Sequence, residues 1–390
     1  MHTHQPYLII PKLISQPTWG GRYIFDSKGW SRDLYEQFRI GQSYELFNGS
    51  KLATGIFDSS SPEFLPEIGN PDSQELVTNN PLVYSGSAHI VLEELVAEYK
   101  DEVLGAQVWQ EHYKMPLLIK LNQSRGNSFQ LHIKSGTHDV HWKPKPESWY
   151  FFENGSVTYG LKPGIDLNRY KQTCEEIANF MQQLSESVRT SQISIQDARN
   201  EAKMFIEQNN PHQFVNTLQV PQDSVVDLSA GGVHHSWEED QQANPHGNIV
   251  YEIQHDVMDP VCTIRSFDQG KIKDDGSVRT LHIADYFTYI DTDPQLNNPQ
   301  SAFQEQHGEH VLSTPYYNMD KIDLSAPRDI VLDESFHHLY VKSGKIELTA
   351  HDVTLTIGAG HSAFVPFGVN QYKINPLMPS SVLTTYISAK

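Results

Sequence analysis

The chain has 390 residues, of which 48 are acidic and 29 basic, and its formal net charge is -19. This length exceeds what one hydrophobic core usually needs and predicts two or three packed units. The acidity argues against nucleic-acid binding, because phosphate backbones are bound by clustered Lys and Arg side chains. It does not exclude an anionic metabolite, which needs only a few cations that converge locally.

The cysteines and the apolar stretches bear on the compartment. Cys174 and Cys262 form neither a disulfide framework nor the paired spacing of a zinc knuckle. The first residues do not follow the pattern of a signal peptide, and no stretch reaches the 18 apolar residues typical of a membrane span. We therefore expect a reduced, cytoplasmic protein without a membrane partner.

The first half of the chain reads mainly as strands. Residues 7–10 are apolar and β-branched, residues 40–46 alternate, and residues 115–121 form a buried run. Residues 91–104 instead have helical periodicity. Trp149, Tyr150, Phe151 and Phe152 form the most strand-like run in the chain.

The period then changes from strand-like to helical. From Asp166, which can cap a helix, apolar residues recur at helical spacing until Leu184, and a second helix is expected from about Ser194 to Gln208, before Pro211. Strands resume near Ser224, and residues 329–390 contain short strands at regular spacing. We therefore expect a mainly β chain with one unit at 1–165 plus 211–325, a helical insertion at 166–210, and a second β unit at 326–390.

Four side chains could form a metal site. Gln130 and His132 lie on one face of a strand because side chains alternate, Glu147 follows fifteen residues after His132, and His234 lies far downstream. Two imidazoles, a carboxylate and an amide oxygen suit zinc. From residue types alone, however, each is more often an ordinary packed or exposed side chain than a ligand.

The order of nine segments along the chain makes the interpretation as metal ligands the stronger one. They are Trp19-Gly20-Gly21 and residues 40–46, 116–120, 128–132 (S-x-Q-x-H), 145–150 (K-x-E-x-W-Y), 230–234, 252–254, 279–282 and 360–366. Together they run nearly the whole length of the chain. In this order the segments resemble the type I mannose-6-phosphate isomerases. The resemblance implies two cupin-type jelly-roll or β-barrel domains with an α-helical insertion, and a sugar-phosphate substrate.

The resemblance also implies one zinc ion per chain. Its ligands would be Gln130, His132, Glu147 and His234. The adjacent His235 competes with His234 for the last position, but the spacing from the preceding glycines favours His234.

The implied reaction interconverts mannose 6-phosphate and fructose 6-phosphate through an enediol, which needs a base and a group that stabilises oxygen charge. The resemblance assigns catalytic roles to Lys145 and Arg265, and substrate binding to Ser128 and Lys271. Glu252 is a further candidate for catalysis, either as an acid or base or as a hydrogen-bond partner of a metal ligand. Because Lys145 would lie near a divalent cation, we expect its pKa to be lowered.

Other functions stay open at this stage. One is an isomerase of another sugar, either unphosphorylated or differently phosphorylated. Another is a cupin that binds metal without catalysis and serves as a sugar sensor or scaffold. A third is a metal-dependent cupin oxygenase, whose two-His, one-carboxylate triad this ligand set could mimic. The amide ligand and the helical insertion argue against the oxygenase.

Overall fold

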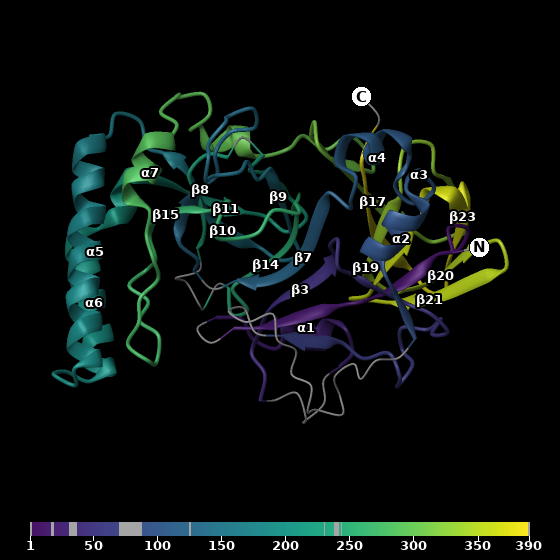
Figure 1. The fold of residues 1–390 in the computed structure, drawn as a ribbon, viewed down its shortest axis with the longest axis horizontal. Helices are drawn as coiled ribbons and strands as arrows, with labels where there is room; N and C mark the ends of the chain where they lie inside the picture. The colour runs from purple at the N-terminus through teal and green to yellow at the C-terminus, as the bar shows by residue number, and fades with distance from the viewer. Residues whose placement is uncertain are drawn as a thin grey trace.

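The structure, a computed structural model, describes residues 2–16, 19–30, 37–69, 88–124, 126–229, 231–237, 242 and 244–388. Within these ranges the chain forms four β-sheets, and a pair of helices lies at one end of the molecule (Figure 1). The expected fold class is confirmed, because the chain is mainly β and cupin-like with helices between β segments.

Two sheets face each other and form the first barrel. The five-stranded sheet has the order β11 (Val215–Val220), β10 (Gly155–Leu161), β13 (His234–Trp237), β8 (Phe129–Leu131) and β15 (Ile264–Phe267). The seven-stranded sheet has the order β12 (Val225–Asp227), β9 (Glu147–Phe151), β14 (Asn248–His255), β7 (Leu117–Ser124), β3 (Ile40–Leu46), β2 (Lys12–Ser15) and β5 (Glu67–Gly69). We call the barrel-facing side of each sheet its inner face.

The central strands of the seven-stranded sheet are buried on both faces. Lys120 of β7 lies opposite Glu252 of β14, which lies opposite Trp149 of β9, and this row faces the barrel. The neighbouring row contains Tyr251 and Tyr150, which belong to the core shared with the C-terminal sheets. Because both faces are covered, the burial of β14 does not alternate along the strand.

Two further sheets form the C-terminal barrel. The eight-stranded sheet has the order β16 (His310–Ser313), β17 (Asn318–Leu324), β24 (Ser380–Tyr386), β19 (His337–Ser343), β22 (Ser362–Val365), β1 (Tyr7–Ile10), β4 (Lys51–Ala53) and β6 (His89–Val91). The four-stranded sheet has the order β18 (Arg328–Val331), β23 (Gln371–Pro376), β20 (Lys345–Ala350) and β21 (Val353–Gly358).

The N-terminal strands cross between the two barrels. In β1, Tyr7 pairs with Phe364 of β22, so strands from the first hundred residues complete the C-terminal sheet. Short strands carry no sequence signal of their partner, and the expected boundaries could not anticipate this pairing. We keep the division into 1–165 plus 211–325, 166–210 and 326–390 as a proposal, amended so that β1, β4, β6, β16 and β17 go with the C-terminal barrel.

Both helices of the insertion form as expected. Asp166 caps α5 (Leu167–Arg189) by accepting hydrogen bonds from the backbone N–H groups of Asn168 and Arg169, and Ser194 caps α6 (Ile195–Asn209). The apolar stripe of α5 packs with Phe129 and Phe267 against the outer face of the five-stranded sheet. In Figure 1 the two helices stand beside α7 and β15, far from the C-terminal barrel.

The remaining helices are short. They are α1 (Tyr23–Ser27), α2 (Leu92–Tyr99), α3 (Asp101–Leu104), α4 (Ala106–His112), α7 (Ile283–Tyr289), and the 3-10 turns η2 (Pro211–Phe214), η3 (Pro299–Ala302) and η4 (Phe367–Val369). The helix expected at 91–104 is broken at Lys100, whose φ is 50°. No helix within the described ranges is both long and apolar enough to span a membrane.

A buried ion pair lies between the barrels. The Lys28 ammonium is 2.7 Å from the Glu45 carboxylate, and the two side chains are 0% and 1% exposed. Glu45 also accepts hydrogen bonds from Ser43 (2.5 Å) and from Ser362 of the C-terminal sheet (2.7 Å). The pair therefore joins β3 of the first barrel to β22 of the second.

We expect Lys28→Met to lower the free energy of unfolding by about 3–5 kcal/mol, because it leaves the Glu45 carboxylate buried without its cation. Lys28→Met combined with Glu45→Met should recover most of this loss, since no charge then remains buried. Calorimetric melting of the three proteins measures both effects. As a control, Lys171→Met removes an exposed pair with Glu175 and should cost less than about 1 kcal/mol; equal losses at both sites would contradict the prediction.

Candidate metal centre

Three neighbouring strands of the five-stranded sheet place polar side chains in one row on its inner face. His234 of β13 and Arg265 of β15 both lie opposite Gln130 of β8. His132 follows two residues after Gln130 and shares its face. His235, one residue further along β13, lies on the outer face, where its ring contacts Phe129.

Glu147 comes from the opposite sheet and meets the two imidazoles inside the barrel. Its Oε1 atom is 3.5 Å from His132 Nε2 and 3.0 Å from His234 Nε2. The three ligand atoms that these residues offer lie within 4.8 Å of one another, and all three residues are buried. Two imidazoles and a carboxylate that converge in this way can hold a transition metal.

The ring orientation of both histidines is set by backbone carbonyls. The Nδ1–H of His132 donates to the carbonyl of Cys262 (2.5 Å), and that of His234 donates to the carbonyl of Gly232 (2.7 Å). Each ring therefore carries its proton on Nδ1 and turns the Nε2 lone pair toward Glu147. Within the described part of the chain, the lone pairs of His132 Nε2 and Glu147 Oε1 face each other in the interior without a donor between them, which is costly unless a cation binds there.

Gln130 lies beside the cluster but presents its amide nitrogen to it. Its Nε2 is 3.1 Å from His234 Nε2, while its Oε1 accepts a 3.4 Å hydrogen bond from the Ser128 hydroxyl. A half-turn about the Cγ–Cδ bond exchanges the two atoms and turns the oxygen toward His234. Gln130 can therefore serve as an oxygen ligand only in this second orientation.

The charge states of the cluster suit metal binding, which needs neutral imidazole and ionised carboxylate. Burial of the ring, reinforced by the nearby Lys145 charge, lowers the pKa of His132 to about 4. Burial alone would raise the pKa of Glu147, but the Lys145 ammonium and the His132 ring hold it well below its usual value. His132 is thus neutral and Glu147 anionic at neutral pH.

A network of charged groups extends from Glu147 along the seven-stranded sheet. The Lys145 ammonium is 2.5 Å from Glu147 and 3.8 Å from Glu252. Glu252 also pairs with Lys120 at 3.0 Å and accepts a 2.6 Å hydrogen bond from Asn122. Lys120 and Asn122 are site residues that the sequence analysis missed, although a lysine inside the apolar run 115–121 was a usable signal.

The expected lowering of the Lys145 pKa rests on a nearby divalent cation, and the protein side chains by themselves act in the opposite direction. Burial would lower the pKa of Lys145, but the carboxylates of Glu147 and Glu252 raise it above its usual value. Two anions close to one cation stabilise the charged form. Lys145 is therefore a fixed ammonium group.

Arg265 is held at the edge of the row. Its Nη2 pairs with the Asp259 carboxylate, its Nη1 donates to the Thr263 carbonyl (3.3 Å), and its Nε is buried without a hydrogen-bond partner. Burial would raise the pKa of Asp259, but the Arg265 charge lowers it to about 2. The Nε–H is therefore among the donors that the guanidinium keeps for another acceptor.

The sequence-derived residues are not all brought together. Gln130, His132, Glu147, His234, Lys145 and Glu252 share the inside of the first barrel, with Ser128 and Arg265 next to Gln130. Lys271 instead donates a hydrogen bond to the carbonyl of Gly126, two residues before Ser128. Its side chain lines a different pocket. His235 bonds to Thr158 and Gln269, away from Glu147.

No protein-family model matches the chain, and no curated protein sequence matches it. Solved structures do. The chain has the fold of the mannose 6-phosphate isomerases. The enzyme from Bacillus subtilis is 16% identical with a TM-score of 0.60, over 98% of this chain and 99% of that one. The enzyme from Salmonella typhimurium bound to substrate (F6P) and zinc is 10% identical with a TM-score of 0.63, over 98% and 100%. At these identities the likeness shows the shared fold.

We expect the wild-type protein to bind one divalent metal ion per chain and His132→Ala to bind at least about tenfold more weakly, because one imidazole ligand is lost. His235→Ala alters the neighbouring histidine, which lies on the outer face of the five-stranded sheet, and this variant should keep its metal. Zinc content after dialysis, measured by mass spectrometry on variants of unchanged circular dichroism, tests this. Equal metal content in the two variants would refute the assignment.

Proposed function

We propose that the protein is a zinc-dependent aldose–ketose isomerase that interconverts mannose 6-phosphate and fructose 6-phosphate. The observation that carries the proposal is the convergence of His132, Glu147 and His234 inside the first barrel of a chain with the mannose 6-phosphate isomerase fold. Gln130 would complete the ligand set through its amide oxygen. Zinc accepts such mixed nitrogen and oxygen ligands and keeps a position for substrate, where it acts as a Lewis acid toward sugar oxygens.

Glu252 is the group we assign to proton transfer between C1 and C2. It is an ionisable carboxylate on the inner face, held by Asn122 and flanked by two ammonium groups, those of Lys120 and Lys145. A carboxylate in this position can accept a proton from one carbon and return it to the next. The fixed charge of Lys145 can stabilise the negative oxygen that develops on the sugar during the step.

The phosphate would bind at Arg265, with the Ser128 hydroxyl contributing from beside Gln130. Arg265 is the cation beside Gln130 and keeps a free buried Nε–H. A guanidinium suits a phosphate because it offers several N–H donors in a plane.

One observation favours a second candidate, an isomerase of unphosphorylated sugar. Three cations on the inner face already have a carboxylate partner: Lys145 has Glu147, Lys120 has Glu252, and Arg265 has Asp259. Without the metal, these three pairs contribute no net charge. A neutral sugar would fit such a surface without displacing an ion pair.

Kinetics with mannose 6-phosphate and with free mannose separate the two candidates. If Arg265 binds the phosphate, Arg265→Ala should lower kcat/KM for the phosphorylated sugar at least about tenfold and leave free mannose little changed. Arg169→Ala, which alters an exposed arginine of α5, is the matched control. Comparable kcat/KM for both sugars in the wild-type protein would end the phosphate assignment.

Lys145→Met should keep the metal and lose turnover by at least about a hundredfold, because Lys145 is a charged partner of the reaction and not a ligand. Lys143→Met changes an exposed lysine two residues away and should match the wild type. Zinc content and kcat are measured on the same preparations. A Lys145→Met protein with normal turnover would remove Lys145 from the mechanism, and a parallel loss of zinc would make its role structural.

A further inference from the structure

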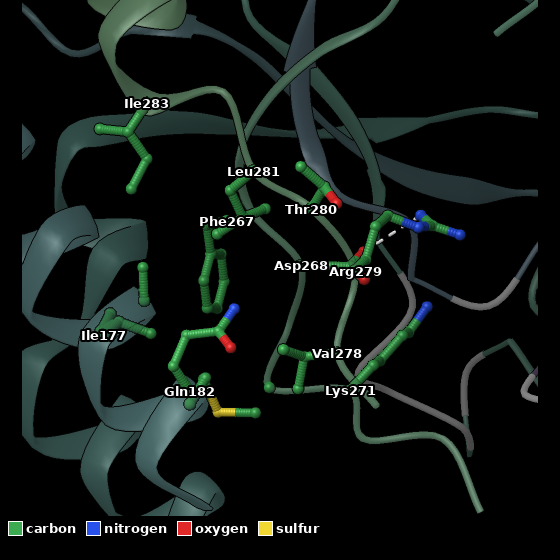
Figure 2. A pocket seen from close by; sticks show the side chains of 13 residues that line it. Ile177, Gln182, Phe267, Asp268, Lys271, Val278, Arg279, Thr280, Leu281 and Ile283 are labelled. Atoms are coloured by element: carbon green, nitrogen blue, oxygen red, sulfur yellow. Dashed lines mark hydrogen bonds and ion pairs between the residues drawn. The ribbon is translucent and has the colours of Figure 1, made fainter. Parts of the chain in front are cut away.

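A second pocket lies beneath α5, on the outer side of the five-stranded sheet (Figure 2). Its volume is about 300 Å³, which lies at the lower end of the range of small-molecule sites. Ile177, Ala178 and Met181 of α5 form one wall, and the opposite wall is formed by the segment from Phe267 to Ile283. Most of this lining is apolar, and the polar groups gather at one side.

This pocket is separate from the candidate metal centre. Phe267, which lines it, pairs with Phe129 of β8, and their rings lie 5.2 Å apart. Phe129 and Gln130 are consecutive in a strand, so their side chains point to opposite faces of the sheet. The metal cluster is on the inner face with Gln130, and the pocket is therefore on the other side of the sheet.

Hydrogen bonds on both sides of the pocket join its two walls and fix the distance between them. Ser185 of α5 donates a 2.7 Å hydrogen bond to the carbonyl of Gly276, and Arg199 of α6 donates a 2.8 Å hydrogen bond to the carbonyl of Ile272. Gly270 and Gly276 have positive φ and approach the helices so closely that a Cβ atom would meet their side chains. These contacts fix the 267–283 segment against α5 and α6, so the pocket is present without a ligand.

Two basic side chains and one acidic side chain line the polar side of the pocket. Lys271 and Arg279 line it together with Asp268, and Figure 2 shows both basic groups projecting to the same side, away from α5. Among the residues that the structure describes, Arg279 makes one side-chain hydrogen bond, of 3.3 Å to Asp268, and most of its N–H donors can serve another acceptor. Gln182 reaches from α5 toward Phe267 and adds an amide to this lining (Figure 2).

We propose that the pocket is a second ligand site that binds a small organic anion with an apolar body. The body would pack between α5 and Phe267, and the anionic group would face Arg279. An apolar cavity with a few convergent polar groups is the usual form of such sites. An arginine with N–H donors left over at the edge of an apolar cavity favours an anionic group over a cationic one.

Anilinonaphthalene sulfonate, an aromatic anion whose fluorescence rises on binding, is a suitable probe for the full-length, zinc-loaded protein. We expect saturable binding of one probe per chain. Ala178→Phe should raise the Kd at least about tenfold by filling the cavity, and Arg279→Gln should raise it by about three- to tenfold in a salt-dependent way.

Three controls keep the test specific. Gln183→Phe adds the same ring at an exposed position of α5 outside the lining, and Lys203→Gln removes an exposed charge from α6; both should bind the probe as the wild type does. His132→Ala should also bind it unchanged, because the metal centre lies across the sheet. Unchanged affinity in Ala178→Phe, or an equal loss in Gln183→Phe or His132→Ala, would overturn the proposal.

Discussion

Each central strand of the seven-stranded sheet serves two barrels at once, because successive side chains point to opposite faces. Glu147 faces the metal cluster, while the next residue, Ser148, contacts the Tyr317 hydroxyl of the C-terminal barrel at 3.2 Å. Tyr251 likewise contacts His338 at 3.0 Å, one residue before Glu252. A shift of one residue in the register would exchange these faces, so the contacts with the C-terminal barrel hold the charged side chains inside the first barrel.

The periodicity of the apolar residues and the helix-capping residues sufficed to locate several helices and strands from the sequence. The alternation at Ile40–Leu46, the aromatic run that became β9, and the capped helices α5 and α6 are all set by local chemistry. The break at Lys100 and the short helix α4 were missed, since backbone conformations with positive φ leave little trace in periodicity. Strand partners were missed for a different reason: β1 and β22 are joined by non-local pairing, which no local pattern specifies.

The order of the sequence motifs indicated the candidate metal ligands, whereas the residue types and their spacing alone did not. His132, Glu147 and His234 were indicated by a resemblance, and the structure brings them into one buried cluster. Lys120 was overlooked because its neighbours are apolar, although only a paired lysine is stable in such a strand. The effect of Glu252 on the Lys145 pKa was not anticipated, because the sequence does not reveal that this residue, more than a hundred positions away, lies beside Lys145.

The pairing of Tyr7 with Phe364 has a consequence for the order in which the protein is made. A ribosome releases β1 first and β22 among the last strands, so the eight-stranded sheet cannot close until synthesis is almost complete. Until then β1 presents an unpaired edge, which other chains can join. Pairing between strands so far apart in the sequence slows folding, and the edge of β1 is covered only in the finished protein.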